Sequence, residues 1–314
     1  NSRLPLISYF QRLDYFVCVV SAGNVPEDIK SLGVCCYSIR LDRSSSLRST
    51  ILSFFHFLGV CIKVRPHLMF AYTVKPILIA CCVRFFFPKT ILVSMFTGLG
   101  ALFDGTLECS NPYLVRIAHF VLRYLLKVSS GVICHNRDDL ELLKAAKMVS
   151  GGIWVNGSGV DLVRFSCCDL PNSSFVFTFI GRLLRTKGLH DFLDAALKFR
   201  ASGRKAKFLV VGSVDDNPGS LTKNELQTLV AEYDFVDFKG QSIDIRPIIR
   251  ESTVIVLPSF REGVPRAILE GMAMGRPVIT TNAPGCKETV IDSRNGALVD
   301  PGQPQQLFEE MVKI

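Results

Sequence analysis

Short apolar runs alternate with stretches of helical apolar spacing along the first half of the 314-residue chain. Runs without regular polar alternation are typical of parallel strands that are buried on both faces. Such strands are expected at 15–20, 34–39, 68–72, 90–95 and 131–134. The helices expected around them are 4–11, 46–64, 77–86, 113–128 and 138–147. This alternation predicts a parallel sheet with helices on both faces.

The same alternation restarts after a glycine-containing segment, 154–159, which we interpret as a hinge. The strands expected beyond it are 175–180, 208–211, 235–238, 253–256 and 277–281. The expected helices are 188–200, 221–232, 244–250, 265–274, one near 285–291 and one near 303–313. Because the chain is too long for one ordinary core, two domains are predicted, 1–155 and 156–314.

The stretch from Leu257 to Gly275 holds two carboxylates in a pattern that indicates a binding site. Glu262 lies on the loop that follows an apolar strand, and Glu270 lies in the next helix, which Pro265 opens. Ligands of open parallel sheets gather at the carboxyl ends of the strands. The two side chains are therefore candidates to hold two hydroxyl-bearing parts of one ligand. Spacing alone equally allows both to be solvated surface charges.

Three sequence blocks carry a resemblance to a known family. They are Arg-Glu-Gly-Val-Pro-Arg-Ala-Ile-Leu-Glu-Gly-Met-Ala-Met-Gly-Arg-Pro-Val-Ile at 261–279, Asn-Ala-Pro-Gly-Cys-Lys-Glu at 282–288 and Asn-Gly-Ala-Leu-Val at 295–299. Together they resemble the paired-glutamate region of glycosyltransferase family 4, whose members are retaining, metal-independent enzymes that use nucleotide-sugar donors. The resemblance implies an α/β fold of the GT-B type, with two Rossmann-like domains whose parallel sheets face a central cleft. The family's N-terminal strand and C-terminal crossover helix are expected to be missing here.

The resemblance assigns roles to the residues of the second domain. It implies that Glu262 holds hydroxyls of the donor sugar and that Glu270 holds the ribose. The backbone N–H groups expected to meet phosphate or sugar oxygens are those of Gly263, Val264 and Arg266. Gly240-Gln241-Ser242 stands where the family's base-binding loop lies. Uridine is the commoner base among such relatives, so a UDP-sugar is the expected donor.

The segment after the strand expected at 175–180 carries a second candidate site. Gly181 permits close approach of the backbone, Arg182 offers a planar fork of donors, and Lys187 precedes a helix N-terminus. The three features favour a diphosphate, and the family's matching Arg and Lys bind the donor's diphosphate. The alternative is a basic loop bound only by water. Arg185 is expected to be solvated.

We interpret Glu262, Arg182 and Lys187 as the catalytic residues. A double displacement through a carboxylate is one course for a retaining transfer. Because Glu262 is better placed to hold hydroxyls and no second acid is evident, we favour front-face attack. In that course the departing phosphate takes the acceptor proton, stabilised by Arg182 and Lys187. No Asp-x-Asp motif or histidine cluster is present, so neither a metal nor a cofactor is expected.

The cysteines and the apolar runs bear on the location of the protein. Eleven cysteines, three adjacent pairs among them and none in a Cys-x-x-Cys motif, argue against a disulfide framework and a zinc site. They favour a reducing cytoplasm. Neither a signal peptide nor a convincing membrane span is expected, because Arg84 and the Pro88-Lys89 pair interrupt the most apolar region, 77–96.

The net charge of +8 lies entirely in the first half. Residues 1–155 hold 17 Lys and Arg against 9 Asp and Glu, whereas the remainder holds 19 of each. An anionic partner is therefore expected to meet the N-terminal domain. Two helical stretches, 48–65 and 113–127, combine apolar and basic residues and are candidates to lie on an anionic membrane. Ordinary core helices whose basic residues face water are the alternative.

The sequence thus predicts a retaining glycosyltransferase that moves a hexose or N-acetylhexosamine from UDP to a glycan acceptor. The segments 72–76 and 97–100 resemble the subgroup that builds surface polysaccharides and glycans on polyprenyl-diphosphate carriers. The enzyme is accordingly expected in the cytoplasm, peripheral at the inner face of the plasma membrane, with no nucleic acid as partner. The alternatives are a UDP-sugar 2-epimerase of the same fold and a non-catalytic protein that binds sugar nucleotides.

Overall fold

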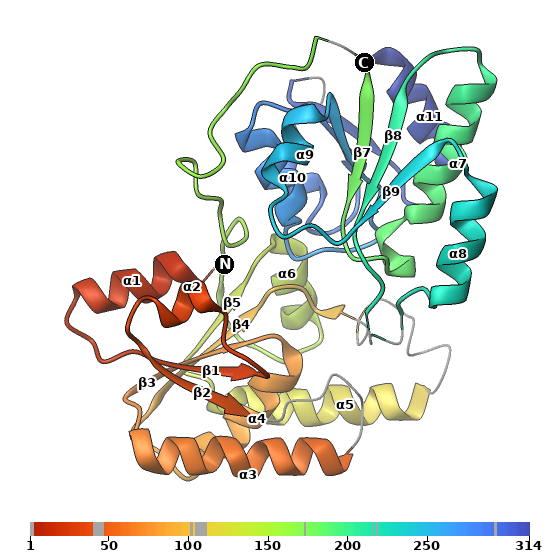
Figure 1. The fold of residues 1–314 in the computed structure, drawn as a ribbon. Helices are drawn as coiled ribbons and strands as arrows, with labels where there is room; N and C mark the ends of the chain where they lie inside the picture. Colours follow the sequence, from red (N-terminus) through yellow and green to blue (C-terminus); the bar gives the residue numbers. More distant parts are fainter. Residues whose placement is uncertain are drawn as a thin grey trace. The chain divides into compact units, whose positions relative to one another are not determined.

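The structure is a computed structural model, and it describes residues 3–39, 47–100, 103, 112–172, 174–215, 217, 219–291 and 294–314. The chain forms two compact units, Asn1–Ser158 and Gly159–Ile314. The division falls inside the segment interpreted as a hinge, close to the boundary predicted after Val155. Each unit has its own parallel strands and its own core (Figure 1).

The N-terminal unit contains two groups of parallel strands. One is the pair β1 (Cys18–Ala22) and β2 (Cys35–Ile39). The other is a four-stranded sheet in the order β3 (Leu68–Tyr72), β4 (Ile91–Phe96), β5 (Gly131–Cys134) and β6 (Ile153–Trp154). The sequence predicts one sheet, and the structure has two because no described strand pairs β1 or β2 with the larger sheet.

The helices of this unit surround the strands. They are α1 (Leu4–Arg12), α2 (Glu27–Lys30), α3 (Leu47–Val64), α4 (Val74–Arg84), α5 (Pro112–Leu125) and α6 (Arg137–Ala145), and α5 continues as the 3₁₀ turn η2 (Leu126–Val128). Helix α4 begins at Val74, earlier than the start predicted at residue 77. Pro76 is tolerated there because the N–H groups of a first helical turn have no intrahelical partner.

The C-terminal unit has one six-stranded parallel sheet. Its order is β12 (Gly296–Val299), β11 (Val278–Thr281), β10 (Val254–Leu257), β7 (Val176–Ile180), β8 (Lys207–Val211) and β9 (Val236–Gly240). Strands β7, β10 and β11 are buried at every position, as expected for strands covered on both faces. Strand β12 is not among the predicted strands.

Helices cover both faces of this sheet, with α9 and α10 on one side and α7, α8 and α11 on the other (Figure 1). Their bounds are α7 (Leu189–Ala201), α8 (Lys223–Glu232), α9 (Arg246–Glu251), α10 (Arg266–Ala273) and α11 (Pro304–Lys313). Two 3₁₀ turns are η3 (Arg185–Lys187) and η4 (Lys287–Thr289). The helix predicted near 285–291 is wrong, since only η4 forms there. Each unit thus has the Rossmann-like arrangement of parallel strands and covering helices that the resemblance implies.

Candidate active site

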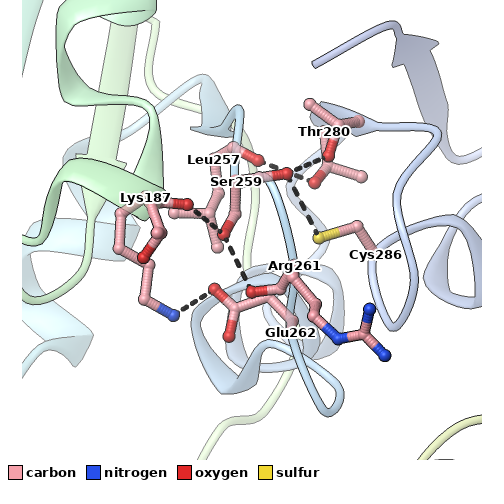
Figure 2. A network of polar contacts seen from close by, with 9 residues as sticks. Lys187, Leu257, Ser259, Arg261, Glu262, Thr280 and Cys286 are labelled. Carbon is pink, nitrogen blue, oxygen red and sulfur yellow. Dashed lines mark hydrogen bonds and ion pairs between the residues drawn. The ribbon is translucent and has the colours of Figure 1, made fainter. Parts of the chain in front are cut away.

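Two loops of the C-terminal unit meet where the strand order reverses. Strands β7 and β10 are hydrogen-bonded neighbours, and the chain continues from β7 to one side of the sheet and from β10 to the other. Ligands bind at such switch points of open α/β sheets. Lys187 follows β7 and Glu262 follows β10, and their side chains form an ion pair (Figure 2). Their side chains are only 15% and 12% exposed, so the pair is largely shielded from water.

The loop that carries Glu262 is tied to the loop that carries Lys187. The hydroxyl of Ser259 donates to the carbonyl oxygen of Thr186 at 3.0 Å, and the N–H of Phe260 donates to the same oxygen at 2.9 Å. Ser259 is fully buried, so this contact is not shared with water. These bonds hold the two backbone segments together independently of the ion pair.

The third loop, after β11, supports Glu262 from the other side. The N–H of Glu262 donates to the carbonyl oxygen of Pro284 at 3.0 Å. Gly285 has φ +79°, and a Cβ added there would lie 2.2 Å from the carbonyl oxygen of Glu262. Only glycine fits such an approach. Pro284 and Gly285 belong to the 282–288 block, which carries the family resemblance but suggests no role by itself.

Buried hydroxyls complete the attachment of the β10 loop. Thr280 donates to the carbonyl oxygen of Leu257 at 2.7 Å, and Thr281 donates to that of Ser259. Cys286 lies beneath them, fully buried, with its sulfur 4.0 Å from the Ser259 carbonyl oxygen. Burial, with the nearby negative charge of Glu262, raises the pKa of this thiol to about 12. It is therefore neutral at physiological pH and acts as packing.

The ends of β7 and β8 approach each other closely at two glycines. The N–H of Gly181 donates to the carbonyl oxygen of Val211 at 3.0 Å. A Cβ at Gly212 would lie 1.8 Å from the carbonyl oxygen of Gly181, so a larger residue would separate the strands. The N–H of Gly212 also donates to the carbonyl oxygen of Gly240 at 2.9 Å. Gly212 is a position of close backbone packing at this edge that the sequence did not reveal.

The two predicted diphosphate cations have separate carboxylate partners. Arg182 Nη1 lies 3.1 Å from Asp215 Oδ2, and the Arg182 side chain is about half exposed. Lys187 is the more buried of the two and pairs with Glu262. Arg185, expected to be solvated, is half exposed and pairs with Glu225. The structure thus brings Lys187 and Glu262 together, while Arg182 contacts a residue that the sequence did not single out.

The second glutamate of the motif lies in helix α10. Arg266, the first residue of α10, places Nη2 2.6 Å from Glu270 Oε1 one turn along the helix. Burial raises the pKa of Glu270, and the positive charges of Arg266 and Arg164 oppose that rise. Arg164, from the segment before β7, is therefore an electrostatic neighbour of Glu270 that no sequence motif indicated.

The remaining predicted donor contacts lie on the loops around these helices. Gly263 is buried and Val264 half-buried just before α10, whose first N–H groups have no intrahelical acceptor. Gly240 ends β9 with φ +67°, and Gln241 is exposed. A cavity of about 330 Å³ nearby is lined by Val163, Arg164, Ser166, Asp244, Arg246, Pro247, Arg250 and Met274.

Within the described ranges, no group of three or more His, Cys, Asp or Glu residues is arranged to hold a metal ion. Ten cysteines are free thiols there, and Cys109 lies outside the described residues. The acidic residues at the carboxyl edge are instead engaged by Lys or Arg. The arrangement suits a ligand that brings both negative charge and hydroxyl groups.

Comparison with known proteins shows which proteins this chain resembles. Residues 174–314 match the family model described as "Glycosyl transferases group 1". The chain is 25% identical over 286 residues to the capsular polysaccharide biosynthesis glycosyltransferase CapM of Staphylococcus aureus, covering 88% of this chain and 74% of CapM. It is 29% identical over 205 residues to the UDP-Gal:alpha-D-GlcNAc-diphosphoundecaprenol alpha-1,3-galactosyltransferase of Escherichia coli, covering 61% of this chain and 52% of that protein.

A similar fold is found in the crystal structure of the Anabaena protein HepE in complex with UDP-glucose. The TM-score is 0.74 with 18% sequence identity, over 100% of this chain and 85% of HepE. At that identity the likeness concerns the fold alone. The family model covers the unit in which the Lys187–Glu262 and Arg266–Glu270 pairs lie.

Proposed function

Because this chain is a glycosyltransferase with the GT-B fold, we propose that it transfers a hexose or N-acetylhexosamine from a UDP-sugar, with retention, as a member of glycosyltransferase family 4. The acceptor is a polyprenyl-diphosphate-linked glycan of surface-polysaccharide or glycoconjugate synthesis. The observation that carries the proposal is the largely shielded Lys187–Glu262 pair at the switch point of the six-stranded sheet.

The pair accounts for recognition of a sugar diphosphate. Lys187 supplies a positive charge for the diphosphate. Glu262 supplies carboxylate oxygens for the hydroxyls of the sugar that is attached to the diphosphate. A donor diphosphate at Lys187 competes with Glu262 for the same ammonium group. Binding of the donor therefore releases a carboxylate oxygen of Glu262 to accept hydrogen bonds from the hexose.

Glu270 and the start of α10 hold the nucleoside side of the donor. A carboxylate accepts hydrogen bonds from both ribose hydroxyls, and burial strengthens such bonds because the local dielectric is low. The backbone N–H groups of Gly263, Val264 and Arg266 meet phosphate or sugar oxygens. The Gly240-Gln241 loop lies at the end of β9 and contacts the base.

The reaction exchanges one C–O bond for another at the anomeric carbon. The bond from that carbon to the β-phosphate oxygen breaks, and the acceptor hydroxyl oxygen forms its new bond on the same face. The acceptor proton passes to the departing phosphate. Arg182 and Lys187 stabilise the negative charge that accumulates on that phosphate, which lowers the barrier more than it stabilises bound donor.

The acceptor and the location extend the proposal to the N-terminal unit. The Escherichia coli relative acts, by its name, on a diphosphoundecaprenol-linked sugar, and CapM serves capsular polysaccharide biosynthesis. A polyprenyl-linked acceptor resides at a membrane surface. We therefore place the enzyme in the cytoplasm, peripheral at the inner face of the plasma membrane, with the positive N-terminal unit toward anionic lipid.

A donor panel tests the proposal. Each of several UDP- and GDP-sugars is incubated with a polyprenyl-diphosphate-linked glycan, and products are detected by mass. One UDP-sugar should give a product one sugar heavier, whose NMR coupling shows the donor's anomeric configuration. An inverted linkage, or turnover only with GDP-sugars, contradicts the proposal.

The two alternatives give different results in the same assay. A UDP-sugar 2-epimerase converts its substrate without any acceptor, so a change of UDP-sugar in acceptor-free reactions would favour it. A non-catalytic binding protein retains UDP affinity and shows no turnover with any acceptor.

A further inference from the structure

Helix α5 presents apolar side chains on two different faces. Val115 and Leu122, together with Leu126 of η2, are buried in the N-terminal unit. Leu122 and Leu126 pack in the unit's own core, so at these positions the helix follows the alternative of an ordinary core helix. A second set is exposed: Tyr113, Ile117, Phe120, Val121 and Tyr124.

The exposed set forms one stripe, which we call the α5 stripe. Its members are three, four and seven residues apart, a spacing that places them side by side along one face of a helix. Ile117 is 59% exposed, Phe120 61% and Tyr124 52%. The rings of Phe120 and Tyr124 contact each other, with centroids 4.6 Å apart. A continuous apolar patch of this kind on a surface marks an interaction site.

A row of cations runs beside the α5 stripe. Arg116, Arg123 and Lys127 are all exposed, and their spacings of seven and four residues place them along one side of the helix. Lys127 Nζ lies 4.6 Å from the centroid of the Tyr124 ring, so the row and the stripe touch. Residues 112–128 contain no Asp or Glu. The formal charges within this segment are therefore all positive.

Helix α3, the other predicted candidate, lacks this combination. It exposes Ile51, Phe55 and Ile62, but its basic residues Arg48 and Lys63 stand only near its two ends. Lys63 Nζ lies 5.5 Å from the ring centroid of Tyr37 on β2. Of these two helices, as far as the structure describes them, α5 is the one on which apolar and basic side chains form adjoining rows.

We propose that the α5 stripe and its row of cations dock the enzyme on the surface of an anionic lipid bilayer. The stripe enters the boundary between headgroups and acyl chains, and Arg116, Arg123 and Lys127 contact lipid phosphates. The inference rests on the proposed function, whose lipid-linked acceptor lies at that depth. No helix of the described residues is both long and apolar enough to span the bilayer.

The charge favours lipid over a second copy of this chain. A symmetric contact between two α5 stripes would bring six cations of the same sign together, which is unfavourable. An anionic bilayer instead provides negative charge along the whole row and an apolar layer beside it. The C-terminal unit, with 19 basic and 19 acidic residues from position 156 on, offers no comparable attraction.

Vesicle co-sedimentation of the full chain tests the proposal. The vesicles are phosphatidylglycerol–phosphatidylcholine mixtures and pure phosphatidylcholine, across a salt series. Each cation contributes roughly fivefold to the partition coefficient. The triple variant Arg116→Ser/Arg123→Ser/Lys127→Ser should therefore bind anionic vesicles on the order of 100-fold more weakly. Its control, Lys198→Ser/Arg204→Ser/Lys205→Ser, removes the same charge from exposed positions of the C-terminal unit and should bind like wild type.

A second measurement reports the α5 stripe directly. Trp154 is the single tryptophan, so Phe120→Trp in a Trp154→Phe background places one fluorophore on the stripe. With anionic vesicles its emission should shift to the blue and be quenched by brominated acyl chains. Val230→Trp in the same background marks an exposed position of α8 and should remain unquenched.

The outcomes separate this surface from the proposed function. Equal binding to both vesicle types, an unquenched Phe120→Trp, or self-association through the stripe without vesicle binding overturns the docking surface. UDP binding and transfer to a detergent-dispersed acceptor would survive that failure. Vesicle binding without transfer to any acceptor would instead contradict the proposed function and leave the surface in place.

Discussion

Charged side chains are arranged differently in the two units of this protein. At the carboxyl edge of the C-terminal sheet, cations and carboxylates are paired, as in Lys187–Glu262 and Arg266–Glu270, and each pair contains a mostly buried group. On α5 of the N-terminal unit, cations stand in a row on an exposed surface beside aromatic rings. Pairs of opposite charges suit a small ligand whose charged and polar groups have fixed positions. A row of positive charges suits a fluid lipid surface, on which the negative headgroups have no fixed positions. Our proposals accordingly place the chemistry in the C-terminal unit and the attachment to the membrane in the N-terminal unit.

The largest effect is expected from Glu262→Gln. Transfer should fall by on the order of 100- to 1,000-fold, the usual cost of losing one transition-state contact, because the amide cannot hold the sugar hydroxyls as a carboxylate does. The affinity for UDP should stay close to that of wild type or rise, since Lys187 no longer has a competing anion. Steady-state kinetics and calorimetry with UDP measure the two quantities.

Glu232→Gln, an exposed glutamate of α8, is the matched control and should leave both quantities unchanged. A large loss of UDP affinity in Glu262→Gln would contradict the separation between sugar and diphosphate contacts. In that case both Lys187 and Glu262 would contribute to binding of the nucleotide.

The next effect concerns the two cations of the diphosphate site. Lys187→Ala should raise the Kd for UDP by about 10- to 100-fold and lower turnover, for loss of a charge-assisted hydrogen bond. Arg182→Ala should act in the same direction but less, because Arg182 is half exposed. Arg185→Ala, on the same loop but paired with Glu225, is the control and should bind UDP normally.

Lys187→Ala should also destabilise the fold by roughly 1–3 kcal/mol, because the mostly buried carboxylate of Glu262 loses its lysine. Adding Glu262→Gln to it should restore part of that stability in denaturant unfolding. If the double variant is no more stable than Lys187→Ala, the pair has no electrostatic role in the folded unit.

An effect of similar size on UDP binding is expected from Glu270→Gln, which should weaken it by roughly 1–3 kcal/mol. Burial raises the pKa of Glu270, so its carboxylate is protonated at a higher pH than an ordinary glutamate as pH falls. The ratio of UDP affinities, wild type to Glu270→Gln, should therefore decline toward acid pH. UDP's own titration cancels in that ratio. A ratio independent of pH would show that Glu270 does not contact the nucleotide as an anion.

The smallest effect, none at all, is expected from EDTA. Arg182 and Lys187 supply the positive charge at the diphosphate, so chelation of divalent ions should leave the transfer rate unchanged. Strong inhibition by EDTA that magnesium or manganese reverses would mean that Arg182 and Lys187 do not suffice to neutralise the diphosphate and that a metal ion is required.

Apolar periodicity by itself determined most of the secondary structure. Strand 68–72 was predicted to the residue, and the α/β alternation of both halves is confirmed. Long apolar runs are reliable because both the strand and its covering helices must be buried. The predictions failed at short elements: β12 was missed and the helix near 285–291 is a 3₁₀ turn. Few residues there leave little periodic signal.

The sequence also determined which residue types stand after which strands, and so placed Lys187 and Glu262 at the sheet's edge. Only the tertiary structure decided that they pair, because β7 and β10 are far apart in the chain yet adjacent in the sheet. The same holds for Gly285 beneath Glu262 and for Asp215 beside Arg182. On α5 the pattern showed apolar residues on several sides, and burial of Val115 and Leu122 decided which side remained for a partner. The spacing of apolar residues shows which side chains a helix can bury together. The packing of the folded unit decides which of them are buried.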